Sequence, residues 1–271
     1  MRVDEHTIEL DSAPAFYRSA GAPATPAIYL HGVPTSSDDW VSPLARMGGL
    51  ALDMIGFGRS SKAGHLDYSI GGLADHVQRL LAGLGVERHS LVAHDWGVPV
   101  ALEIALRDPS RIDRIVLISP PALLEGFRWP RHARVLRMRV LGELAMGATS
   151  RRTLALGLRR ASATPNAWTD ERVGSAWKQF DQGTQRATLR LLRHTDPRWV
   201  SARALDLGQL SRSTLILHGE RDPWIAPGLP EAYAALLPRG KSRGIADAGH
   251  WPWLDRSDVI DTLQGFLEPS A

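Results

Sequence analysis

The sequence contains no cysteine, which excludes disulfide bonds, thiolate metal sites and a cysteine nucleophile. It also lacks a long apolar run, because its longest apolar stretches, such as VPVAL and IVLI, are far shorter than the roughly 20 residues that cross a bilayer. The N-terminus, MRVDEHTIEL, carries acidic residues where a secretory signal needs an apolar stretch. These absences predict a cytoplasmic protein with no membrane partner.

The composition is that of an ordinary globular protein, with 44% hydrophobic and 23% charged residues in a chain long enough, at 271 residues, to bury a sizeable core. The net charge of +3 hides an uneven distribution, because Phe127 to Arg212 holds 16 arginines and one lysine against six acids. These arginines alternate with apolar residues at helical spacing, as in RHARVLRMRV, and form no continuous basic tract. We interpret them as solvated or acid-paired helix faces of a distinct structural unit. An acidic partner for this unit is a remote alternative, and no nucleic-acid partner is expected.

Short apolar segments alternate with helical patterns along most of the chain. Strands are predicted at 16–19, 27–30, 48–54, 89–93, 114–119, 213–219 and 241–246, and helices at 72–84, 98–108 and 257–267. This alternation predicts an α/β fold with a mostly parallel central sheet and helices on both faces. The segment 121–212 contains no convincing strand. We therefore predict a core built from 1–120 and 213–271, with a helical cap inserted at 121–212.

Chemically suggestive residues follow four of the predicted strands, as HGVP, HDWG, GERD and AGH. The most informative segment is LVAHDWGVPVAL, in which a strand enters a tight turn with Asp95 at its apex and a helix follows. This is the context of a nucleophile elbow, with a carboxylate in place of the serine of G-x-S-x-G. An aspartate that only caps the following helix is the alternative interpretation.

Two further residues complete a possible catalytic triad. Asp222 lies in the loop after the strand at 213–219, and His250 follows the last strand. Nucleophile, acid and base then occur in the order typical of α/β-hydrolases. The backbone N–H groups of Val33 and Trp96 are the predicted oxyanion hole. We expect His31 to support the HGVP loop by hydrogen bonding, and Asp53 to order its own loop.

These motifs resemble the aspartate-nucleophile branch of the α/β-hydrolase superfamily, which holds haloalkane dehalogenases and soluble epoxide hydrolases. The resemblance covers nearly the whole chain through HGVPTSSDDW, DMIGFGRSSK, VAHDWG, GERDP and DAGHWPWL, and in the cap it is one of position only. It implies the α/β-hydrolase fold, a small-molecule substrate (an alkyl halide or an epoxide), water as co-substrate and no cofactor. The histidines are scattered and form no HExxH motif, so no metal is expected. A monomer and a homodimer are both compatible with the sequence.

A carboxylate nucleophile suits displacement at saturated carbon, where it forms an alkyl ester, and is poorly suited to acyl transfer. His250, oriented by Asp222, is then expected to activate the water that hydrolyses this ester. Dehalogenases hold the departing halide with N–H donors that include a tryptophan next to the nucleophile, and Trp96 matches that position. Epoxide hydrolases usually protonate the leaving oxygen with two cap tyrosines. None of the four tyrosines, Tyr17, Tyr29, Tyr68 and Tyr233, lies in the cap segment, which favours cleavage of carbon–halogen bonds in haloalkanes.

The second halide donor is less defined. One group of dehalogenases carries asparagine directly after HG, where this chain has Val33, and another uses a cap tryptophan. The cap tryptophans are Trp129, Trp168, Trp177 and Trp199, of which Trp177 and Trp129 are the favoured candidates.

Two other functions stay open. One is epoxide hydrolysis with a cap histidine, such as His132 or His194, as the acid. The other is a homologue that binds or rearranges a ligand without covalent chemistry. Trp40, Trp251 and Trp253 either line the cavity or fill the core.

Overall fold

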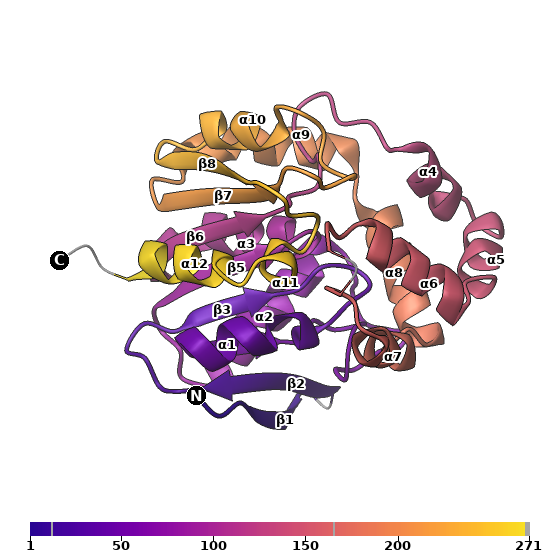
Figure 1. Cartoon of the computed structure of the whole chain (residues 1–271), viewed down its shortest axis with the longest axis horizontal. Helices are drawn as coiled ribbons and strands as arrows, with labels where there is room; N and C mark the ends of the chain where they lie inside the picture. The colour runs from indigo at the N-terminus through magenta and orange to yellow at the C-terminus, as the bar shows by residue number, and fades with distance from the viewer. Residues whose placement is uncertain (12, 165, 269–271) are drawn as a thin grey trace.

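A central sheet organises the computed structural model, which describes residues 1–11, 13–164 and 166–268, without the side chains of 132 and 199–201. The sheet has eight strands in the order β1-β2-β4-β3-β5-β6-β7-β8 (Figure 1). β1 and β2 form an antiparallel hairpin at one edge, β2 pairs antiparallel with β4, and the other neighbours are parallel. The strands are β1 (Asp4–Leu10), β2 (Ala13–Ala20), β3 (Ala27–Leu30), β4 (Gly49–Leu52), β5 (His89–His94), β6 (Ile112–Ile118), β7 (Ser213–Gly219) and β8 (Gly240–Ile245).

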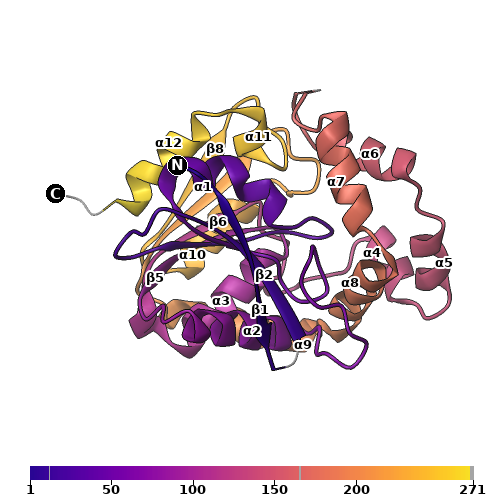
Figure 2. The same cartoon turned by 90° about the horizontal axis from the view of Figure 1, so that it is seen from below.

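Helices cover both faces of this sheet, as Figure 2 shows most clearly. One face carries α2 (Ile70–Gly83), α3 (Gly97–Arg107) and α10 (Leu229–Leu236), and the other carries α1 (Val41–Met47), α11 (Pro252–Asp255) and α12 (Val259–Leu267). Short 3-10 helices, η1 (Ser37–Trp40) and η2 (Pro109–Arg111), complete the core connections. The central strands are largely apolar because their successive side chains enter opposite cores. In β6, for example, Leu117 faces one core and Val116 the other.

A helical insertion separates β6 from β7. It contains α4 (Arg131–Arg137), α5 (Leu141–Gly147), α6 (Arg151–Arg160), α7 (Asp170–Gln179), α8 (Gln182–His194), α9 (Pro197–Asp206) and the 3-10 helix η3 (Leu207–Gln209). Figure 1 shows α4 to α8 gathered at one side of the sheet, whereas α9 returns toward the core. There Arg203 of α9 pairs with Glu103 of α3, with Nε and Oε2 3.0 Å apart. No described helix is both long and apolar enough to cross a membrane.

The predicted α/β architecture is confirmed, with differences at its edges. The strand at 213–219 has the predicted bounds, and the predicted helix at 98–108 is observed one residue earlier as α3. The sequence did not predict β1, whose alternating charged residues are the exposed side of an edge strand. It also did not predict α1, which has only seven residues and carries Pro43 in its first turn.

The crossing of α3 over β3 leaves no room for a side chain at Gly97. A Cβ there would lie 2.7 Å from the carbonyl oxygens of Leu30 and His31. We expect Gly97→Ala to lower the free energy of unfolding by about 1–3 kcal/mol, because backbone atoms must shift. Gly83→Ala is the matched control, since a Cβ there meets nothing within 4 Å. It should stabilise α2 by about 0.5–1 kcal/mol. Urea unfolding measures both, and equal effects of the two substitutions would contradict the packing argument.

Candidate active site

Asp95 occupies the apex of the turn between β5 and α3. Its φ is +46°, an uncommon value for a residue with a side chain, and its N–H donates to the Ile118 carbonyl at 3.0 Å. The residue as a whole is half-buried. The N-terminus of α3 has no side-chain cap, which removes the interpretation of Asp95 as a capping residue. The turn has the form of the predicted elbow.

The HGVP loop lies against this carboxylate. The Val33 N–H donates to Asp95 Oδ2 at 3.0 Å. Gly32 is required beside it, because a Cβ at this position would lie 2.7 Å from the same oxygen. His31 supports the loop as predicted. Its Nε2 accepts from the Met54 N–H at 3.1 Å, so its Nδ1–H donates to the Gly32 carbonyl at 2.7 Å.

Asp53 orders two loops at once. One carboxylate oxygen accepts from the Ser37 N–H and the other from the Arg59 N–H, both at 2.7 Å. Asp53 therefore joins the loop after β4 to the segment that follows HGVP, which extends its predicted role.

His250 and Asp222 form a buried pair. The Nδ1 of His250 lies 2.8 Å from Asp222 Oδ2, and the Trp224 N–H donates to Oδ1 at 2.9 Å. Burial alone would raise the pKa of Asp222, but the hydrogen bond and charge of His250 lower it below its usual value. With Nδ1–H facing the carboxylate, Nε2 carries the lone pair. That nitrogen has no partner among the described residues.

Two residues that the sequence analysis left without a role hold the histidine in place. His94 is fully buried, and its Nε2 lies 2.8 Å from the His250 carbonyl, to which it donates. Burial lowers the pKa of His94 well below its usual value, so the ring is neutral. Asp255 joins the loop before His250 to the cap: its Oδ2 accepts from the N–H groups of Gly249 at 2.7 Å and of Ala163 at 3.0 Å.

The cap also bonds the histidine directly. The His250 N–H donates to the carbonyl of Ala161, at the end of α6, at 2.7 Å. For the contacts of His94, Asp255 and Ala161 with the histidine loop, the sequence offers one signal. Polar residues occur inside the otherwise largely apolar motifs VAHDWG and DAGHWPWLD.

Burial raises the pKa of the Asp95 carboxyl, although the charge of His250 and the N–H groups of Val33 and Trp96 oppose this shift. The two carboxyls near His250 are therefore shifted in opposite directions, a pattern that often separates chemical roles. One is partly exposed and held by backbone N–H groups, and the other is buried and paired with an imidazole. Such an arrangement is suited to nucleophilic attack followed by activation of water.

Of the two favoured cap tryptophans, the structure brings one to the elbow. Trp129 stacks on Trp96, with ring centroids 6.0 Å apart and planes 11° from parallel, and its buried Nε1 has no partner among the described residues. Trp177 instead packs on Phe180 inside the cap, at 6.2 Å, in the cluster with Met146.

The other tryptophans singled out from the sequence belong to the core or the cap. Trp168 is buried against Trp251, at 4.9 Å. Trp40 and Trp253 stack at 4.3 Å, and these two with Trp251 fill the core. The side chains of Trp199 and His132 lie outside the described residues.

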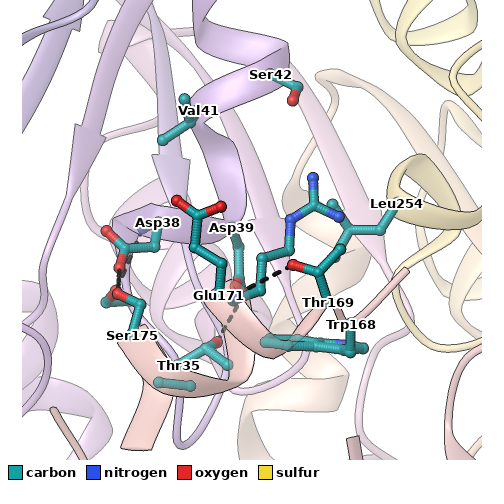
Figure 3. A pocket seen from close by; sticks show the side chains of 13 residues that line it. Thr35, Asp38, Asp39, Val41, Ser42, Trp168, Thr169, Glu171, Ser175 and Leu254 are labelled. Atoms are coloured by element: carbon teal, nitrogen blue, oxygen red, sulfur yellow. Dashed lines mark hydrogen bonds between the residues drawn. The ribbon is translucent and has the colours of Figure 1, made fainter. Parts of the chain in front are cut away.

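A pocket of about 420 Å³ opens between η1 and α7 (Figure 3). None of Asp95, Asp222 and His250 lines it. Its wall includes Asp39, whose Oδ2 accepts from the Thr35 hydroxyl at 2.6 Å and from Trp251 Nε1 at 3.2 Å. Burial raises the pKa of Asp39 to about 7. The described residues contain no cluster of histidine, aspartate and glutamate suited to a metal ion.

Comparison with known proteins identifies the family. The family model for the alpha/beta hydrolase fold matches residues 25–257. The chain belongs to the α/β-hydrolase family. This α/β-hydrolase is 24% identical to epoxide hydrolase 3 of Mus musculus, over 99% of this chain and 77% of the mouse protein. It is 39% identical to a haloalkane dehalogenase of Mesorhizobium japonicum over 105 residues, which span 35% of this chain and 32% of that enzyme.

Solved structures show the same fold at low sequence identity. The epoxide hydrolase CorEH superposes with a TM-score of 0.85 at 19% identity, covering 98% of both chains. The haloalkane dehalogenase DbeA from Bradyrhizobium elkanii superposes with a TM-score of 0.84 at 20% identity, also covering 98% of both chains. This α/β-hydrolase is thus related to both groups of enzymes, and its substrate has to be argued from its own residues.

Asp39 generates a pH-dependent prediction for this α/β-hydrolase. The carboxyl of Asp39 binds a proton more tightly in the folded protein than in the unfolded chain, where its pKa has the ordinary value of 3.8. The protonated carboxyl therefore contributes stability that is fully present below pH 3.8, and this stability is lost as the pH rises through about 7. Asp39→Asn keeps an oxygen acceptor and removes the titration. Relative to the wild type, its free energy of unfolding should rise by up to about 4 kcal/mol between about pH 4 and about pH 8.

Urea unfolding across this pH range measures the difference. Asp261→Asn, at a half-exposed carboxylate on α12, is the control and should show no such trend. A pH-independent difference between Asp39→Asn and the wild type would contradict the prediction.

Proposed function

We propose that this α/β-hydrolase cleaves carbon–halogen bonds in haloalkanes through an ester formed on Asp95. The observation that carries the proposal is a carboxylate at the apex of the elbow, with one oxygen bonded to the Val33 N–H. Nearby is a histidine whose Nε2 has no partner in the part of the chain that the structure describes. A carboxylate displaces a leaving group from saturated carbon to give a stable ester, whereas attack on an acyl group would give a reactive anhydride. This chemistry argues against lipase or peptidase activity.

In the first step Asp95 attacks the carbon that bears the halogen. Because Oδ2 accepts the Val33 N–H, Oδ1 is the attacking atom in this proposal. A carbon–oxygen bond forms as the carbon–halogen bond breaks, and the halide leaves with the bonding electrons. The product of this step is an alkyl ester of Asp95.

In the second step His250 Nε2 removes a proton from water, and the hydroxyl attacks the ester carbonyl carbon. Oδ2 becomes the oxyanion, and the N–H groups of Val33 and Trp96 stabilise it; one such donor typically contributes about 3 kcal/mol. Asp222 stabilises the imidazolium. As the intermediate collapses, the bond from the carboxyl carbon to Oδ1 breaks and the imidazolium of His250 returns its proton to the leaving alkoxide, which releases the alcohol. Asp95 is regenerated, and the net reaction converts haloalkane and water into alcohol and hydrogen halide.

Two indole N–H groups are the proposed halide donors. Trp96 adjoins the nucleophile, and Trp129 stacks on it with a buried Nε1 for which the described residues provide no acceptor. A buried donor without a partner is costly, and a halide at this point would satisfy it. Trp177 packs inside the cap, so its contacts support this role less than those of Trp129.

Epoxide hydrolysis is the second candidate, favoured by the similarity to mouse epoxide hydrolase 3 along nearly the whole chain. It requires an acid to protonate the leaving oxygen. Three tyrosine hydroxyls already donate to backbone carbonyls: Tyr29 to Gly48, Tyr68 to Ala63 and Tyr233 to Pro121. His194 is exposed, with Nδ1 4.0 Å from an Asp67 carboxylate oxygen. These contacts favour a halide over an epoxide as the substrate.

His250→Gln should trap the ester, because attack on the halide does not need a base whereas hydrolysis does. Steady-state turnover should fall by about 10³-fold or more. With a bromoalkane, intact-mass analysis should show one added alkyl group, located on the peptide that contains Asp95. His194→Gln is the matched control and should turn over without an adduct.

An epoxide that yields a diol and an adduct, without any halide being cleaved, would favour the second candidate. Conversion of substrate without an adduct in His250→Gln, and without transfer of heavy oxygen from water into Asp95 of the wild type in a single turnover, would exclude the covalent mechanism.

Trp129→Phe should keep the stacking on Trp96 and remove only the N–H. We expect kcat/KM for a bromoalkane to fall by about 10–100-fold, the usual value of a hydrogen bond to a charged group. Trp177→Phe is the matched control and should change kcat/KM by less than about threefold. Bromide release measures both variants, and bromide quenching of tryptophan fluorescence reports halide binding separately. The assignment is wrong if the Trp177 variant shows the larger loss.

A further inference from the structure

A cluster of exposed apolar side chains on the cap plays no part in the proposed chemistry. Five of the eleven large apolar side chains that are strongly exposed among the described residues lie within residues 135–144. We call them the cap patch: Val135 at 43% exposure, Met138 at 51%, Val140 at 67%, Leu141 at 47% and Leu144 at 63%. Scattered apolar residues are ordinary on a protein surface, whereas a group of this kind marks a site of interaction.

The cap patch is held in its exposed position. Val140, between α4 and α5, has a φ of +71°, a strained value for a β-branched residue. Arg193 of α8 supports the turn from beneath, donating to the Met138 carbonyl at 3.0 Å and pairing with Glu143 at 2.6 Å. The strain therefore persists because surrounding contacts fix the backbone. The patch is part of a built surface.

Uncompensated positive charge surrounds the cap patch. The guanidinium groups of Arg131, Arg134 and Arg139 have no hydrogen-bond or ion-pair partner among the described residues. The only acid between residues 131 and 144 is Glu143, which Arg193 neutralises.

The basic and apolar groups share one surface. A hollow of about 1270 Å³ beside α8 is lined by Val140 and Leu144 together with Arg139, Arg186 and Arg190. Its occupant must therefore offer both apolar contact and negative charge.

We propose that the cap patch docks this protein on anionic phospholipid membranes. Apolar side chains that enter the acyl boundary, surrounded by arginines that reach lipid phosphates, are the pattern of a peripheral membrane surface. A symmetric contact with a second copy would bring the same arginines against one another, which disfavours self-association through this surface. Figure 1 shows α4 and α5 at the outer edge of the molecule, on the side away from both termini, where a flat surface can reach them.

Two successive side-chain contacts join the proposed docking surface to the elbow. Arg137 of α4 lies 4.4 Å over the Trp129 ring, and Trp129 stacks on Trp96. If the proposed function holds, docking brings the site near a lipid phase in which haloalkanes concentrate. The membrane proposal departs from the sequence-based expectation of no membrane partner, which rested on the lack of an apolar span. Peripheral docking requires no such span.

Sedimentation with phospholipid vesicles tests the proposal. The full chain should bind vesicles that contain phosphatidylglycerol, release from them at high salt, and bind pure phosphatidylcholine vesicles weakly. Val140→Ser with Leu144→Ser should weaken binding by about tenfold or more. Replacing Arg131, Arg134 and Arg139 by glutamine should weaken it roughly fivefold per arginine. Leu205→Ser is the apolar control, at an equally exposed position on α9, and should bind as the wild type.

Because the chain has no cysteine, a single introduced one can report membrane contact directly. Leu144→Cys, labelled with an environment-sensitive dye, should shift its emission to the blue on anionic vesicles, and labelled Leu205→Cys should not. No binding to anionic vesicles, or equal shifts at both positions, would overturn the proposal. The proposal would also be overturned if the variant with Val140→Ser and Leu144→Ser lost self-association but still bound lipid. None of these readouts uses catalysis, so failure of the proposed function is detected separately by halide release.

Discussion

The close approach of β3, β5 and α3 at the Asp95 turn is the constraint on which the candidate site depends. Because β3 and β5 are parallel neighbours, the HGVP loop and the elbow leave the sheet side by side. Only then can the Val33 N–H reach the Asp95 carboxylate. The contact also requires the absence of a Cβ at Gly97, which lies against the carbonyl oxygens of β3 and its following residue. Fold and candidate chemistry are therefore linked through backbone packing, and a site of this kind does not tolerate a shift of β3 against β5.

The candidate site also depends on the position of His250, which is held by contacts from both the core and the cap. His94 and Asp222 fix it from the core, whereas Ala161 fixes its backbone from the end of α6. Asp255 strengthens the same junction by bonding N–H groups on both sides. The cap therefore also helps to position His250, because a displacement of α6 would move the carbonyl that its N–H contacts. If the cap binds another surface, the hydrogen bond between Ala161 and His250 links that surface to the base of the candidate triad.

Local pattern explains most of what the sequence predicts correctly. The second half of β6 is a continuous apolar run because both of its faces are buried, and the elbow is formed by consecutive residues around Asp95. The contributions of His94 and Asp255 were missed because their partners are distant along the chain and are backbone atoms, which leave no pattern. The choice between Trp129 and Trp177 depends on which way a ring faces in the cap, and periodicity does not determine that. The edge strand β1 alternates charged and apolar residues that also suit a loop.

The two carboxyls near His250 bear on the proposed type of reaction but not on the leaving group. The imidazole of His250 lowers the pKa of Asp222, whereas burial raises the pKa of Asp95, whose Oδ2 accepts the Val33 N–H. That asymmetry comes from the sheet and would be equally useful for a halide or an epoxide. The leaving group needs a donor on the opposite side of the reacting carbon, and in the proposed function Trp129 of the cap shares that role with Trp96. A neutral indole N–H can donate a hydrogen bond to a departing halide but has no proton to give to an alkoxide. The proposed function therefore assigns much of the choice between the two leaving groups to residues of the cap.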